Sequence, residues 1–156
     1  MNRVIARLPE SMGELCLVRM GIQVRGLSAW LLARRLRSAI AADARRAIAG
    51  SAGLLESQAF TIGINHFGFL QYWRSFEELD AWSRREPHSE WWRAAVERMR
   101  LKQDLGVYHE TFLVGAPDVE SIFLNCRPTG LAAFGLLGEA VGPLTTSRGR
   151  LGKSKS

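Results

Sequence analysis

The order of strand-like and helix-like segments is the feature that most constrains how this chain can fold. Residues 14–25 are rich in β-favouring residues that loosely alternate between two faces. Over 27–50, leucine, isoleucine and alanine recur at helical spacing with arginines on the other side. Strand-like segments then follow at 58–64 and 67–75. The first half therefore reads as a strand, a helix and two strands.

The second half repeats the pattern of helix and strand. Asparagine and glycine tolerate a positive φ, so residues 65–68 predict a hairpin turn between the two neighbouring strands. Ser75 and Glu78 have the S-x-x-E spacing of a capping box, which opens a helical segment. That segment is interrupted at Pro87, and a last strand-like segment covers 106–114.

The resulting order, β-α-β-β-α-β, predicts an α+β, ferredoxin-like fold. Its four-stranded antiparallel sheet would have the order 4-1-3-2, with the helices on one face. The other face must also be covered, and a second copy of the sheet is the economical cover. We therefore expect a homodimer, in which the two sheets form a dimeric α+β barrel. We expect an N-terminal extension over 1–13, a single domain over 14–144 and a disordered basic tail over 145–156.

Charge and hydropathy exclude several classes of protein. No apolar run reaches the roughly 20 residues that a membrane-spanning helix needs, and the N-terminus lacks the apolar core of a signal peptide. We expect a cytoplasmic protein without integral membrane association. The net charge of +6 is concentrated in the helical segment and the tail, so we predict no nucleic-acid partner. The basic helix could instead lie on a membrane surface.

The stretch "GVYHETFLV" places two ionisable residues side by side in a strand. Neighbours on a strand point to opposite faces, so His109 and Glu110 need separate explanations. A buried carboxylate needs a partner, and we predict a structural ion pair of Glu110 with Arg19 on the adjacent strand. Arg74 is the alternative partner.

His109 has two interpretations. It is either a core histidine bonded to a backbone carbonyl, or a general base in a pocket. The stretch "QYWR" favours the pocket, because it brings polar and aromatic groups together. In this hypothesis His109 and Tyr72 are catalytic, Gln71 is a hydrogen-bond donor and Trp73 is a wall.

His88 begins a helix, with two tryptophans one turn further on. A helix N-terminus favours neutral imidazole, so we place His88 and Trp92 in the substrate pocket. The alternative is a packed aromatic cluster in which His88 only caps the helix. The three histidines are spread along the chain, and we predict no metal site. Nucleotide and flavin motifs are also missing from the sequence.

Several motifs together resemble a known family. They are "QYWRS", "HSEWW", "GVYHET" and the stretch from Glu120 to Leu131. They are similar to small monooxygenase-like proteins of the antibiotic-biosynthesis-monooxygenase type, in the dimeric α+β barrel superfamily. One branch of that family accompanies fungal terpenoid and polyketide pathways. Phe123 stands where the family pattern has tyrosine, and one residue is inserted before Pro128. The resemblance covers roughly residues 14–135.

The resemblance implies a cofactor-independent monooxygenase acting on an aromatic, polyketide or terpenoid-type small molecule in secondary metabolism. One alternative is a cyclase or isomerase that uses the same base without oxygen. Another is a non-catalytic dimer that binds haem or a lipophilic ligand. We predict no cofactor, with haem as the exception that this last alternative allows.

Overall fold

The computed structural model describes residues 2–152, which belong to two compact units. The larger unit comprises Cys16–Phe112, and the smaller comprises Met1–Leu15 together with Leu113–Ser156. The strands are β1 (Arg3–Arg7), β2 (Glu14–Val24), β3 (Leu54–Thr61), β4 (His66–Trp73), β5 (Leu105–Gly115), β6 (Phe123–Leu124) and β7 (Leu136–Glu139). The α-helices are α1 (Leu27–Ala49), α2 (Phe76–Ser83), α3 (His88–Lys102) and α4 (Ser147–Arg150), and short 3-10 helices are η1 (Ala116–Asp118), η2 (Gly130–Ala133) and η3 (Gly142–Thr145).

The larger unit contains a four-stranded sheet in the order β3-β4-β2-β5. Numbered within this sheet, the order is 4-1-3-2 read from the β5 edge, so the predicted topology is confirmed. The register pairs Val18 with Gln71 and Gly21 with Gly68 across the antiparallel strands β2 and β4. The element order is β-α-β-β-α-β, as the sequence predicts, with α2 and α3 together forming the second helical segment.

The bounds of the central hairpin differ from the prediction. β3 begins at Leu54 rather than at residue 58, and a register shift interrupts its pairing between Leu54 and Glu56. The turn covers 62–65, where Gly63 has a φ of 75°, so β4 already begins at His66. Ser75 caps α2 through a hydrogen bond from the Glu78 N–H, as its spacing predicts.

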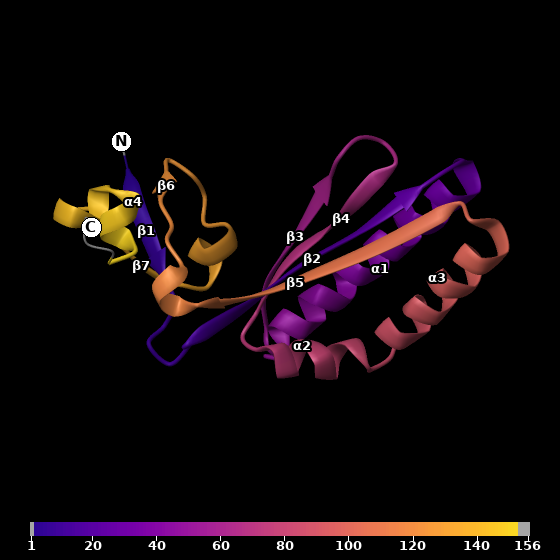
Figure 1. Ribbon diagram of the computed structural model, residues 1–156, viewed down its shortest axis with the longest axis horizontal. Coiled ribbons are helices and arrows are strands. Elements are labelled where there is room, and N and C mark those ends of the chain that lie inside the picture. The colour runs from indigo at the N-terminus through magenta and orange to yellow at the C-terminus, as the bar shows by residue number, and fades with distance from the viewer. Residues whose placement is uncertain (1, 153–156) are drawn as a thin grey trace. The chain divides into compact units, whose positions relative to one another are not determined.

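Three helices, α1, α2 and α3, lie on one side of this sheet (Figure 1). Two apolar clusters fill the space between the helices and the strands. In one, Trp73 of β4 packs with Trp82 of α2 and Ala44 of α1. In the other, Phe67 packs with Ala95 of α3. Within Cys16–Phe112, no helix covers the other face of the sheet.

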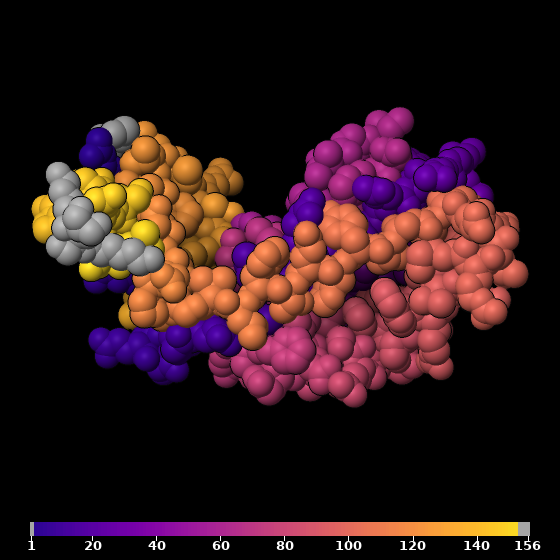
Figure 2. Space-filling view, viewed as in Figure 1, coloured from indigo at the N-terminus to yellow at the C-terminus, as the bar shows by residue number. Residues whose placement is uncertain are grey.

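β5 lies at one edge of the sheet, and most of its residues are exposed or half-buried. Figure 2 shows the strand lying open along the visible surface of the larger unit. Side chains near the middle of β5 are therefore accessible to solvent, in contrast to those of β4. Among residues 2–152, no helix is both long and apolar enough to span a membrane.

The smaller unit differs most from the sequence analysis. Residues 1–13 were expected to be an extension, but β1 is the central strand of a three-stranded sheet with the order β6-β1-β7. After β5 the chain forms η1, which ends at Asp118, and continues into β6. The predicted disordered tail contains α4, where Arg150 is bound to Glu120 at 2.6 Å. Residues 153–156 of that tail lie outside the described residues.

Candidate functional site

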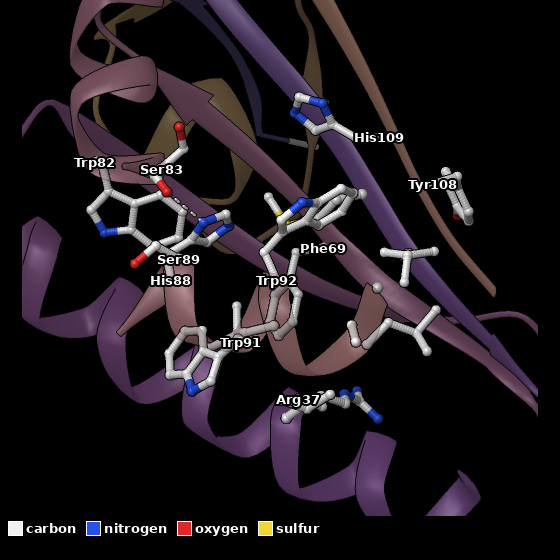
Figure 3. A pocket seen from close by; sticks show the side chains of 18 of the residues that line it. Arg37, Phe69, Trp82, Ser83, His88, Ser89, Trp91, Trp92, Tyr108 and His109 are labelled. Carbon is white, nitrogen blue, oxygen red and sulfur yellow. Dashed lines mark hydrogen bonds between the residues drawn. The ribbon is translucent and has the colours of Figure 1, made fainter. Parts of the chain in front are cut away.

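A cavity of about 630 Å³ lies between the helix-covered face of the sheet and the three helices. All of its lining residues belong to the larger unit. Figure 3 shows that its walls are mainly aromatic, and the aromatic residues of the lining include Phe67, Phe69, Trp82, Trp91 and Trp92. Such a volume with apolar walls and a few polar groups is typical of a small-molecule site.

His88 is the best-defined polar group of the cavity. Its Nδ1 lies 2.9 Å from the backbone oxygen of Ser83, the last residue of α2. A carbonyl oxygen can only accept, so Nδ1 carries the proton and Nε2 keeps its lone pair. Nε2 forms no hydrogen bond with the residues that the structure describes. Figure 3 shows the ring between Trp82 and the side chains of Phe69 and Trp92.

The surroundings of His88 favour its neutral form. Burial lowers the pKa of His88 below its ordinary value, and the nearby His109 lowers it further. The hydrogen bond with Ser83 and the carboxylate of Asp43 act in the opposite direction but do not reverse the shift. The ring of Trp82 lies 4.6 Å from that of His88 between centroids, which excludes water from one face of the imidazole. His88 is thus a neutral imidazole with an available lone pair inside an apolar cavity.

His109 also lines the cavity, from the edge strand β5. Unlike His88 it is exposed, and its Nε2 lies 3.4 Å from the hydroxyl of Thr111. The structure therefore brings both predicted histidines to one cavity, where His88 is half-buried and His109 is exposed. Trp92, also predicted, lines the cavity from α3 and is 52% exposed.

Three predicted site residues, Gln71, Tyr72 and Trp73, do not line this cavity. Gln71 and Trp73 are fully buried in the other part of the core, where the Trp73 indole N–H donates to the Gln71 side-chain oxygen at 3.1 Å. Tyr72 lies between them in β4 and so faces the opposite side of the sheet. There, burial and then Glu56 raise the pKa of the Tyr72 phenol. Because strand neighbours diverge, the side chains of Gln71 and Tyr72 point to opposite faces of the sheet.

The face of the sheet without helices carries a different set of polar groups. Arg19 and Glu110 form the predicted ion pair at 2.6 Å, but their side chains are 39% and 47% exposed rather than buried. The Arg19 guanidinium also lies over the rings of Tyr108 and Phe60. The Tyr108 hydroxyl is 2.9 Å from Nε2 of His66. The alternative partner of Glu110, Arg74, pairs instead with Glu78.

Sequence reasoning missed Arg37 and Trp82 as cavity residues. Arg37 was assigned to the solvent face of its helix with the other arginines of 27–50. Its neighbours Leu36 and Ile40 also line the cavity, so the edge of the apolar stripe was the available signal. Within residues 2–152, no three His, Cys, Asp or Glu side chains gather in a way that could hold a metal ion.

One known protein family matches most of this chain. The profile of the monooxygenase af470-like family matches residues 16–131, which is most of the 156-residue chain. The chain belongs to the monooxygenase af470-like family. This membership confirms the predicted relationship to monooxygenase-like proteins. A sequence search among curated proteins gives no match.

Solved structures share the fold of this af470-like chain. Aldoxime dehydratase OxdRE, in complex with butyraldoxime, has a TM-score of 0.64 and 17% identity, over 96% of this chain and 42% of that chain. Another aldoxime dehydratase has a TM-score of 0.56 and 20% identity, over 89% of this chain and 39% of that chain. The chain thus spans about two fifths of the length of these enzymes. At this identity they show the α+β fold alone.

A third structure is SnoaB, a cofactor-independent oxygenase from Streptomyces nogalater. It has a TM-score of 0.42 and 13% identity, over 64% of this chain and 91% of that chain. The α+β, ferredoxin-like fold of the af470-like chain therefore rests on its own strand order and on the longer matches.

Proposed function

We propose that this protein is a cofactor-independent monooxygenase that oxidises an aromatic, polyketide or terpenoid-type small molecule of secondary metabolism. His88 is the general base, and His109 is a second imidazole at the accessible side of the same cavity. The proposal differs from the sequence-based hypothesis, in which His109 was the base and Tyr72 its partner. His88 is preferred because it is half-buried, whereas His109 is exposed, and because its tautomer is fixed by Ser83.

One observation carries the proposal: a neutral imidazole presents an unpaired lone pair to a cavity with aromatic walls. General-base catalysis requires a proton acceptor that is unprotonated near neutral pH, and the lowered pKa of His88 meets this requirement. Membership of a monooxygenase-like family is the independent support.

The chemistry needs only a base, a dry cavity and oxygen. His88 Nε2 would take a proton from an acidic C–H or phenolic O–H of the substrate, leaving a carbanion or phenolate. This electron-rich anion reduces dioxygen: one oxygen atom forms a bond to the substrate carbon and the other leaves as water. Exclusion of water would keep the anion reactive towards oxygen rather than solvated.

Anthrone is a suitable probe, because it is a flat aromatic ketone with one acidic methylene group. Its oxidation to anthraquinone consumes one dioxygen and releases one water. We expect the purified protein to accelerate oxygen uptake with anthrone without any added cofactor, as measured with an oxygen electrode. Uptake at the rate of the protein-free reaction, for anthrone and for phenolic analogues, would contradict the proposal. Product formed from such substrates under anaerobic conditions would instead indicate a cyclase or isomerase.

A second candidate function is binding of haem or another lipophilic ligand without turnover. The hydrogen bond from His88 Nδ1 to a backbone carbonyl favours it, since metal-binding histidines commonly fix their second nitrogen in this way. The ultraviolet–visible spectrum, recorded as purified and after titration with haem, distinguishes the two functions. A Soret band that saturates at one haem per chain, and that is lost in His88→Asn, would favour the haem-binding candidate.

We also propose that the protein acts as a homodimer through the sheet face that lacks helices. Aromatic and aliphatic side chains alternate with the Arg19–Glu110 pair on this face, and Phe112 is 49% exposed there. Sedimentation equilibrium is expected to give twice the chain mass of 17.4 kDa. Leu70→Asp, on the same face, is expected to shift the equilibrium to monomer, whereas a wild-type monomer at all concentrations would exclude the dimer.

A further inference from the structure

Arg37 is the unexplained charge of the cavity. It is half-buried on α1 and lines a cavity whose other α1 residues, Leu36 and Ile40, are aliphatic. Its guanidinium lies 6.0 Å from the centroid of the Phe67 ring. Arg37 forms no ion pair with any residue that the structure describes. Removing a charge from water without a partner is costly, so an anion at this position would be stabilising.

The remaining charges of the lining do not provide that anion. Asp80 is engaged by Arg84, whose Nε lies 3.0 Å from each carboxylate oxygen. Arg93 is paired with Glu86 at 2.7 Å. The described carboxylates next to the cavity are therefore neutralised by their own arginines, and Arg37 adds a net positive charge. The lining as a whole favours an anionic ligand over a neutral or cationic one.

Arg37 and His88 are placed at different parts of the cavity. Figure 3 shows Arg37 well separated from His88, with Trp91 and Trp92 between them in this view. A ligand that reaches both groups must be elongated and largely apolar. Its charged end would lie at Arg37, away from the atom that His88 deprotonates.

We propose that the ligand of this cavity is an aromatic or polyketide-like carboxylic acid, and that Arg37 binds its carboxylate. The proposal rests on the proposed function in so far as both require a small molecule in this cavity. A guanidinium presents two parallel N–H donors that match the two oxygens of a carboxylate, which gives orientation as well as affinity. Arg37 would thus hold the substrate in one direction, with its acidic carbon at His88.

A pair of isosteric probes tests the charge preference directly. 2-Naphthoate and 2-naphthamide have the same ring system and differ in the charge of one substituent. Binding can be followed by quenching of tryptophan fluorescence, because Trp82, Trp91 and Trp92 line the cavity. We expect the wild-type protein to bind naphthoate about tenfold more tightly than naphthamide, as a charge-assisted pair predicts. Arg37→Met should bind the two probes equally, and Arg37→Lys should keep part of the preference.

Arg34→Met is the matched control. Arg34 lies on the same helix, but its guanidinium stacks on Trp30, 4.8 Å from the ring centroid, and it does not line the cavity. This variant should keep the wild-type preference for naphthoate. Circular dichroism of each variant shows whether it is folded, and Arg37→Lys tests the proposal if Arg37→Met is not.

The outcomes separate this inference from the proposed function. Equal binding of both probes by the wild-type protein, or a preference that persists in Arg37→Met, would overturn the role of Arg37 and leave the cavity as a ligand site. Absence of binding of either probe at millimolar concentration would overturn both. A preference lost equally in Arg34→Met would show an effect of overall charge and would also overturn the role of Arg37.

Discussion

The two faces of the four-stranded sheet are built from the same strands but differ in their chemistry. On the helix-covered face, Trp73 and Phe67 pack under the helices. In the cavity at this face, Nε2 of His88 keeps a lone pair without a hydrogen-bond donor among the described residues. On the other face, Arg19, Glu110 and Tyr108 engage one another on a surface that no helix of the larger unit covers. One face leaves polar groups available for a ligand, while the other satisfies them internally.

Two glycines show how the face without helices, here called the second face, is organised. Gly21 and Gly68 are paired across β2 and β4. A side chain on Gly21 would meet the ring of Tyr108 at 2.5 Å, and one on Gly68 would meet the Met20 backbone oxygen and the Phe60 ring. The rings of Tyr108 and Phe60 therefore occupy the space that side chains at Gly21 and Gly68 would need. This allows both rings to lie beside Arg19. In the proposed function, the helix-covered face serves chemistry, and in the proposed dimer the other face serves association.

The largest effect is expected in the core of the helix-covered face. Trp73→Ala should lower the free energy of unfolding by about 3–5 kcal/mol, because it opens a cavity and removes the donor to the buried Gln71 oxygen. Phe112→Ala, at an exposed site in β5, should cost only about 1 kcal/mol. Urea unfolding measures both. A cost of Phe112→Ala close to that of Trp73→Ala would show that the second face is as buried as the first.

The second-largest effect is expected on activity, where a variant of the cavity should lose oxygen uptake and a variant of the second face should not. His88→Asn keeps a side-chain N–H for the Ser83 carbonyl but removes the basic nitrogen, so oxygen uptake with anthrone should fall by about 100-fold or more. His66→Asn, on the other face beside Tyr108, should change the rate less than about twofold. Equal losses in the two variants would remove the functional distinction between the faces.

A smaller effect concerns the pH dependence of stability. The pKa of His88 is lowered in the folded protein below the ordinary value of 6.5, so at slightly acidic pH the unfolded chain binds more protons than the folded one. The free energy of unfolding should therefore be fully developed above about pH 6.5 and decrease below it. His88→Asn should lack this decrease. Urea unfolding of both proteins at pH 7.5 and 5.5 measures the difference, and parallel pH profiles would contradict the burial of His88.

The smallest effect is expected on the second face of the isolated chain. Glu110→Gln and Arg19→Met should each lower Tm by less than about 3 °C, because an exposed ion pair contributes little. Differential scanning calorimetry at two protein concentrations tests this. A much larger decrease at the higher concentration alone would place the pair inside the proposed dimer, where a broken pair is costly.

The order of elements along the chain could be predicted from local periodicity and turn residues, and the ferredoxin-like arrangement then implied the strand order of the sheet. The central hairpin differed only in its bounds. β1 could not be predicted in the same way, since its partners β6 and β7 lie more than a hundred residues further along the chain. A five-residue strand with such distant partners has no local signal beyond "RVIAR" itself.

The residues of the cavity likewise divide into those that could be predicted from the sequence and those that could not. His88 could be proposed because it begins a helix one turn before two tryptophans, and His109 because it is an ionisable residue inside a strand of apolar residues. Tyr72 was proposed because the residues around it suited a pocket, but its position in β4 turns it to the face of the sheet opposite the cavity. Arg37 could not be told from the other arginines of its helix, because only the packing of three helices decides which edge of α1 meets the cavity.

The hydrogen bond between His88 and Ser83 serves two roles, because it satisfies the end of α2 and also orients the imidazole in the cavity. The backbone oxygen of Ser83 belongs to the last turn of α2, where a carbonyl has no partner within the helix. The imidazole that presents Nε2 to the cavity also satisfies this helix end. A lineage that needs only the helix end can replace His88 with any small donor such as asparagine. A lineage in which His88 is the proposed base cannot make this replacement, because the asparagine side chain has no basic nitrogen that could accept the proton.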